Sequence, residues 1–188
     1  MTAEQARTEI LDVATRLFAA RGYEATSLTD IATEWGGSKA TVLYHFHTKA
    51  AILHELVRPA AAALTSLLDR SAGAPPVRAR REVALGFVDL AIGYREALAS
   101  YPAAIRTIVE IPELADLGLV EAGDRLVAVL GGAAGDTLSS ATATLFLNGV
   151  LAAAQTLAHL PADELAAALA TLAGRLLELG DDPPAATG

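Results

Sequence analysis

The chain has 188 residues and a formal net charge of −8 at pH 7; 53% of its residues are hydrophobic but only 5% are aromatic. It has no cysteine, which excludes disulfide bonds and thiolate metal sites. Alanine occurs 42 times and strand-like alternation of Val, Ile, Thr and Tyr is missing, so the composition predicts an all-α protein. The helical periodicity along the chain divides it into about nine helices.

The first two predicted helices have clear start and stop residues. The first covers residues 3–20 and ends before Gly22, a residue suited to the backbone conformation that closes helices. The second begins after Ser27, with Asp30 in the position of a capping box. Both carry apolar residues at helical spacing, which predicts that they pack on a common core.

A Gly-Gly turn at residues 36–37 separates the second helix from a third, which Ser38 caps. Thr48 caps a fourth helix that extends toward Leu68. Pro59 lies inside this fourth helix. Because proline removes a backbone hydrogen bond and clashes with the preceding turn, we predict a kink or break near residues 55–59.

The remaining helices are predicted from prolines and glycines near their ends. These helices cover residues 77–99, 112–130, 137–158 and 161–179, and a further short helix begins at residue 102. We also predict a linker at 71–76, a glycine loop at 131–135 and a disordered tail at 181–188.

One segment is long and uncharged enough to raise the question of a membrane span. Residues 137–162 carry no charged side chain, and that length could cross a bilayer. They also contain many hydroxyl and amide groups, which hydrocarbon disfavours. The N-terminus lacks an apolar signal core. We therefore expect a cytoplasmic protein with no membrane association.

Residues 27–49 are the most informative part of the chain. Two short helices joined by a glycine-containing turn are the arrangement that places a recognition helix in the DNA major groove. Residues 35–50 contain Lys39 and Lys49 and no acidic residue, although the chain as a whole is acidic. This weak positive charge predicts low affinity for non-specific DNA, so binding would depend on base contacts and dimerisation.

The segment also resembles a known family. Residues 8–56 are similar to the N-terminal domain of the TetR (tetracycline-repressor-like) transcription regulators. The residues that carry the resemblance are Ile10, Ala14, Leu17, Phe18, Gly22, Tyr23, Thr26, Ser27, Ile31, Ala32, Gly36, Ser38, Thr41, His45, Phe46, Lys49 and Leu53. The resemblance implies a helix-turn-helix domain at residues 1–50 and a helical ligand-binding and dimerisation domain at residues 51–180, connected by the helix that starts at 48.

Three departures from the family pattern lie in the motif itself. The family often has Gly where this chain has Ala40. The family usually has a small residue, Gly and Val in the turn, where this chain has Trp35, Gly36 and Gly37. Its usual tyrosine stands at the position of Leu43, whereas the tyrosine of this chain comes one place later, at Tyr44.

Side-chain chemistry assigns roles to the motif residues. Lys39 can donate to guanine, Ala40 and Leu43 can contact a thymine methyl group, and the resemblance implies that Thr29 also reaches a base. Phosphate contacts are expected from hydroxyl, imidazole and ammonium groups, with the two serines acting first as helix caps. These residues are Ser27, Ser38, Thr41, Tyr44, His45 and Lys49.

Other classes of function have less support. His45, His47 and His54 are poorly spaced for one metal ion, and no catalytic set or phosphate loop is present, so we expect no metal, cofactor or catalytic residue. Two alternatives stay open: an effector-independent architectural or division-associated DNA-binding protein, and a helical small-molecule carrier or enzyme that keeps the fold.

The rest of the chain is interpreted mainly through the resemblance. It implies a homodimer, which the small and apolar faces of helices 137–158 and 161–179 favour, on a palindromic operator of double-stranded DNA. It also implies a largely apolar effector that relieves repression, with Pro59 as a candidate transmission point. Candidate pocket residues are Phe87, Tyr94, Tyr101, Ile105, Arg106, Glu110, Phe146, Asn148 and Gln155.

Overall fold

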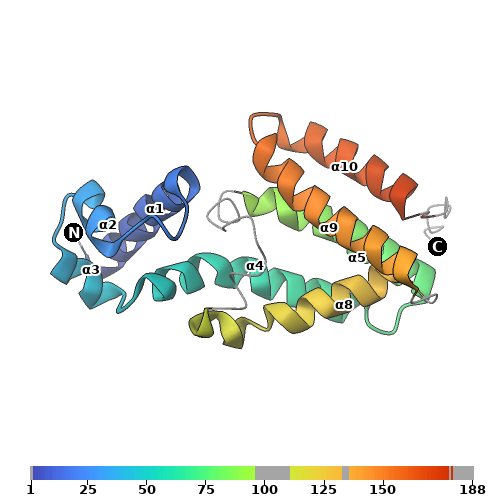
Figure 1. Ribbon diagram of the computed structural model, residues 1–188, viewed down its shortest axis with the longest axis horizontal. Helices are drawn as coiled ribbons and strands as arrows, with labels where there is room; N and C mark the ends of the chain where they lie inside the picture. The colour runs from blue at the N-terminus through green and yellow to red at the C-terminus, as the bar shows by residue number, and fades with distance from the viewer. Residues whose placement is uncertain (1, 96–110, 133–135, 178, 180–188) are drawn as a thin grey trace. The chain divides into compact units, whose positions relative to one another are not determined.

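The computed structural model describes residues 2–95, 111–132, 136–177 and 179, and in these ranges it is helical without any strand (Figure 1). The all-α prediction is confirmed. The described elements are α1 (Ala3–Arg21), α2 (Leu28–Trp35), α3 (Lys39–His45), α4 (Lys49–Ser71), α5 (Pro76–Gly93), the 3-10 helix η1 (Pro112–Leu117), α8 (Leu119–Gly131), α9 (Thr137–Thr156) and α10 (Ala162–Leu176).

The chain forms two compact units. The first comprises residues 1–65 and 94–122, and the second comprises residues 66–93 and 123–188. The N-terminal part of α4 therefore belongs to the first unit and its C-terminal part to the second. The predicted tail at 181–188 and the predicted short helix from residue 102 lie outside the described residues.

The predicted helix starts are confirmed in the N-terminal region. The Thr2 and Ser27 hydroxyls each cap a helix within a complete capping box, and the Ser38 hydroxyl accepts from the Thr41 amide. Thr48 Oγ1 accepts from the Ala51 amide at 3.0 Å at the start of α4. These short-range hydrogen bonds fix where each helix begins, so α1 to α4 start where the sequence predicts.

Of the kink or break predicted near residues 55–59, the break is wrong, because α4 continues through Pro59 from Lys49 to Ser71. An interior proline costs a helix about 3 kcal/mol. Val57, Ala60 and Ala61, on either side of Pro59, are all at least 95% buried. Their packing holds both flanking turns in place and outweighs the lost hydrogen bond.

The single helix predicted over residues 112–130 is also wrong. Pro112 does begin a helix, but the 3-10 helix η1 ends at Leu117, and α8 begins only at Leu119. Gly118 between them has φ 61°, in the left-handed region that closes helices. The apolar pattern continues across Gly118, which is why the periodicity alone joins the two elements.

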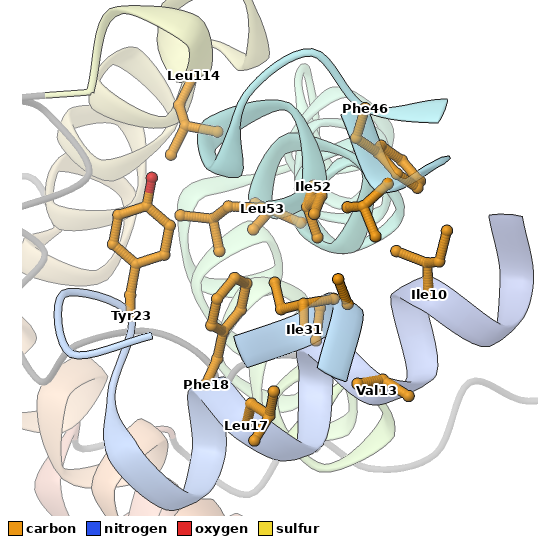
Figure 2. Close-up of a cluster of buried hydrophobic side chains, with 14 residues drawn as sticks. Ile10, Val13, Leu17, Phe18, Tyr23, Ile31, Phe46, Ile52, Leu53 and Leu114 are labelled. Atoms are coloured by element: carbon orange, nitrogen blue, oxygen red, sulfur yellow. The ribbon is translucent and has the colours of Figure 1, made fainter. Parts of the chain in front are cut away.

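The core of the first unit lies among α1, α2, α3 and α4. Figure 2 shows Ile10, Phe18, Ile31, Ile52 and Leu53 in this cluster, and each is at most 1% exposed. Leu114 of η1, far away in sequence, is 2% exposed and joins the cluster at the end where Tyr23 and Leu53 lie. Residues near 114 are therefore part of the unit that holds the helix-turn-helix segment.

In the second unit α5, α9 and α10 pack against one another (Figure 1). Among the described helices, α4 and α9 are long and apolar enough to cross a membrane by length and composition alone, a test that core helices of soluble proteins also pass. Only 28% of the apolar window in α9 is buried. This helix thus carries an apolar surface that its own unit leaves uncovered.

Candidate nucleic-acid interface

The helix-turn-helix segment is built by α2 and α3, which pack on each other around the turn at residues 36–37. At the start of α2, hydrogen bonds from the Ser27 hydroxyl and from the Ser27 amide hold the pKa of Asp30 below its usual value. The turn begins with Gly36, whose φ of 83° favours glycine. Local capping and one left-handed residue thus fix the geometry of the motif.

The third helix divides into a buried side and an exposed side. Val42 is fully buried, and Phe46, directly after the helix, is 2% exposed. Lys39 and Ala40 are exposed, Leu43 is 37% exposed and Tyr44 is 77% exposed. The core therefore orients α3 so that the residues predicted to read bases face outward.

Most of the predicted phosphate-contacting residues also lie at the surface of this segment. Ser27 and Ser38 are exposed, and Thr41 and His45 are half-buried. The Ser38 and Thr41 hydroxyls lie 2.8 Å apart, and the Tyr44 ring stands edge-on to the His45 ring at 5.2 Å between centroids. Thr29, the predicted base contact on α2, is exposed as well. The motif therefore offers hydroxyl and imidazole groups beside the exposed face of α3.

Lys49 makes a more specific internal contact than the sequence indicated. Its Nζ donates to the Tyr23 carbonyl oxygen at 2.6 Å and to the Glu24 carbonyl oxygen at 3.5 Å. The ammonium group also lies 4.0 Å from the centroid of the Tyr23 ring. Lys49 therefore ties the loop between α1 and α2 to the start of α4, and at most one of its three hydrogens is left for a phosphate.

Two supports of the motif come from α1 and were missed by sequence reasoning. Trp35 Nε1 donates to Glu9 Oε2 at 2.9 Å, which fixes the end of α2. Arg7 donates to the His45 carbonyl oxygen at 3.1 Å, at the end of α3. Both are contacts between residues more than 25 positions apart, and the sequence pattern of one helix contains no sign of them.

Five of the predicted pocket residues lie among those that the structure describes. Phe87 and Phe146 are buried in the second unit, whereas Asn148 is exposed and donates to the Thr144 carbonyl oxygen of its own helix at 2.8 Å. Tyr94 and Gln155 are half-buried. The other candidates lie outside the described residues: Tyr101, Ile105, Arg106 and Glu110. The pocket stays a prediction.

Comparison with known proteins places the motif in a family. Residues 10–56 match the model of bacterial regulatory proteins of the tetR family. The HTH-type transcriptional repressor KstR2 of Rhodococcus jostii (strain RHA1) is 42% identical over 52 residues, which are 28% of this chain and 26% of that protein. The HTH-type transcriptional regulator AcrR of Shigella flexneri is 39% identical over 54 residues, which are 29% of this chain and 25% of that protein.

The sequence match thus spans about a quarter of the length of these curated relatives. The fold likeness is wider. The solved structure of the ketosteroid transcriptional regulator KstR2 of Mycobacterium tuberculosis has a TM-score of 0.72, covering 92% of this chain and 93% of that one at 16% identity. At this identity the likeness establishes the fold of the chain beyond its N-terminal domain.

Proposed function

Because this chain belongs to the tetR family of bacterial regulatory proteins through its residues 10–56, we propose that it is a sequence-specific DNA-binding transcriptional regulator. The observation that carries the proposal is the exposed side of α3, where Lys39, Leu43 and Tyr44 project from a helix whose other side is buried. A recognition helix needs this combination of rigid support and exposed reading side chains.

The contacts to DNA divide into two classes. Lys39 and Ala40, at the N-terminal end of α3, are positioned to meet base edges, with Leu43 beside a thymine methyl group and Thr29 as a further base contact. Phosphates are held by Ser27, Ser38, Thr41, Tyr44, His45 and Lys49. Tyr44, which is 77% exposed, takes the place of the tyrosine usual at position 43.

We further propose that the protein is a homodimer joined through α9 and α10. Leu138 and Leu145 of α9 are 75% and 74% exposed, and Leu172 and Leu176 of α10 are 46% and 53% exposed. Large apolar side chains in such numbers on two neighbouring helices are typical of an interface. A two-fold dimer matches a palindromic operator whose half-sites lie about one helical turn, or a multiple of it, apart.

The regulator acts as a cytoplasmic repressor that a small, largely apolar effector releases from DNA. An effector can do this only by binding one conformation more tightly, with a coupling of about 1–3 kcal/mol. The segment at residues 111–119 offers a route into the DNA-binding unit. Leu114 lies in its core, and the His54 ring nitrogen lies 3.2 Å from Asp116 Oδ1. This segment is therefore a second candidate transmission point beside Pro59, which lies inside the continuous α4.

The experiment that tests this function is an unbiased selection from a pool of random double-stranded DNA by the purified full chain. The proposal expects enrichment of a palindrome with two half-sites. If no sequence is enriched above the input pool, the proposal that the protein is a sequence-specific regulator is wrong.

A further inference from the structure

We propose that Arg7 is a positioning residue for the recognition helix: from α1 it sets the orientation of α3 and so controls how well the protein discriminates its operator from other DNA. The inference rests on the proposed function. Arg7 lies before the segment that matches the family model, residues 10–56.

Three groups hold the Arg7 guanidinium at the C-terminal end of α3. Nη1 donates to the His45 carbonyl oxygen at 3.1 Å, and Nη2 lies 3.1 Å from Glu55 Oε2. The guanidinium carbon lies 4.3 Å from the centroid of the Phe46 ring. Arg7 therefore connects α1, the end of α3 and α4 through one side chain.

The Arg7 contact stabilises the last turn of α3, which lacks a closing turn of its own. The helix has only seven residues and ends in Phe46, whose extended backbone (φ −140°, ψ 109°) provides no left-handed closing turn. Its last carbonyl groups carry the negative end of the helix dipole. A positive guanidinium that donates to one of them satisfies the acceptor and stabilises the dipole together.

Glu55 keeps the guanidinium in this place. Its Oε2 accepts from Arg7 at 3.1 Å and from Arg58 at 3.3 Å. Burial of Glu55 opposes its ionisation, but the hydrogen bonds and charges of Arg7 and Arg58 outweigh that effect and lower the pKa of Glu55. One guanidinium nitrogen of Arg7 donates to the His45 carbonyl oxygen and another contacts Glu55 Oε2, so the two contacts together fix the orientation of the guanidinium. This orientation by two partners inside the unit supports a role in placing α3.

The test compares Arg7→Gln with Arg16→Gln in the full chain. Arg16 is a matched control, because it also lies on α1 and also makes an ion pair between helices, 3.3 Å from Glu34 Oε1 of α2. Both variants remove one positive charge, so both lose similar affinity for non-specific DNA. Binding is measured on the palindrome that the wild type enriches and on a scrambled duplex, over a range of salt concentrations.

Arg7→Gln is expected to lower the ratio of specific to non-specific affinity about tenfold, which corresponds to about 1.4 kcal/mol. Arg16→Gln is expected to leave the ratio within about twofold. An equal ratio in the two variants would overturn the proposal. So would a salt slope that falls by about one unit in Arg7→Gln alone, since that identifies a direct phosphate contact.

Amide hydrogen exchange provides a readout that needs no DNA. The Phe46 amide donates to the Val42 carbonyl oxygen at 2.8 Å in the last turn of α3. Arg7→Gln should speed exchange at this amide about tenfold over Arg16→Gln, with α1 amides unchanged. Equal exchange in both variants contradicts the positioning role even if the protein binds DNA. Faster exchange together with a wild type that selects no DNA shows that α3 is held by Arg7 but that the proposed function is wrong.

If Arg7→Gln does not fold, a variant that keeps the positive charge tests the proposal instead. Arg7→Lys retains the positive charge on a single nitrogen but lacks the planar fork that reaches His45 and Glu55 together. It should lower the affinity ratio about threefold with an unchanged salt slope, and an unchanged ratio would overturn the proposal.

Discussion

A β-carbon added to Gly37 would overlap Cζ3 and Cε3 of the Trp35 ring. The ring covers the turn between α2 and α3, and its Nε1 donates to Glu9 Oε2 at 2.9 Å. In the turn, where the family usually has a small residue, Gly and Val, this chain differs at Trp35 and Gly37, and these two differences are therefore coupled. The large residue at position 35 occupies the space that a side chain at position 37 would need.

This coupling predicts a non-additive double-mutant cycle. Gly37→Val alone should destabilise the fold by about 1–3 kcal/mol, because the valine and the ring cannot share the space. Trp35→Ala should also destabilise it, through lost packing. Combined, the two changes should cost at least about 1 kcal/mol less than the sum of the single effects, as measured by urea denaturation. Simple additivity would show that the ring moves aside without cost.

Lys49 contributes to stability through its contact with Tyr23. Lys49→Met removes a charge-assisted hydrogen bond and a cation–π contact at a half-buried position, and should cost about 1–2 kcal/mol. For a chain of this length, that lowers the thermal midpoint by roughly 2–8 °C. Lys39→Met removes the same charge from an exposed position and serves as the control, with an expected change of about 1 °C. Equal midpoints for the two variants would mean that the Lys49 contact contributes nothing.

The Tyr23 hydroxyl should ionise well above the ordinary range. Burial raises the pKa of Tyr23 from 10.0 to about 12, with additional repulsion from Glu24 and Glu113. Because the folded-state pKa is the higher one, the neutral phenol stabilises the fold fully below pH 10, and this stabilisation is lost as the pH rises from about 10 to about 12. In rapid pH-jump absorbance measurements, Tyr23→Phe should remove a step near pH 12. The control Tyr44→Phe should retain that step; if Tyr44→Phe removes it instead, the assignment is wrong.

The dimer proposal makes Leu145 a sensitive position. Leu145→Glu should weaken self-association about a hundredfold, because a buried and unpaired carboxylate would meet an apolar partner surface. Sedimentation should then shift from a dimer toward the 19.3 kDa monomer. Val77→Glu introduces the same charge at another exposed apolar residue, 65% exposed on α5, and this variant should remain dimeric. A monomeric wild type, or a dimeric Leu145→Glu, would contradict the proposed interface.

The sequence was most predictive where the structure depends on short-range interactions. Ser27, Ser38 and Thr48 cap their helices through residues three positions on, so the starts of α2, α3 and α4 could be predicted. The exposed and buried sides of α3 also follow from helical spacing around Val42 and Phe46.

Other features depend on contacts that sequence spacing does not encode. Gly118 looks like a helix-interior glycine until its left-handed backbone is seen. Leu114 reaches a core made by residues more than fifty positions away. Lys49 was expected to face a phosphate, and its contact with the Tyr23 carbonyl oxygen arises only when α1 and α4 are packed together.

Parallel selections from random DNA with the wild type and with Lys39→Ala test most directly whether α3 reads DNA sequence. We expect the wild type to enrich a palindrome and Lys39→Ala to enrich the same palindrome with one half-site position relaxed, at a cost of about 1–3 kcal/mol for that base. Tyr44→Phe, in contrast, should leave every base preference intact. Identical palindromes from the wild type and Lys39→Ala, or no enriched sequence from either, would contradict the proposal that α3 reads DNA sequence through Lys39.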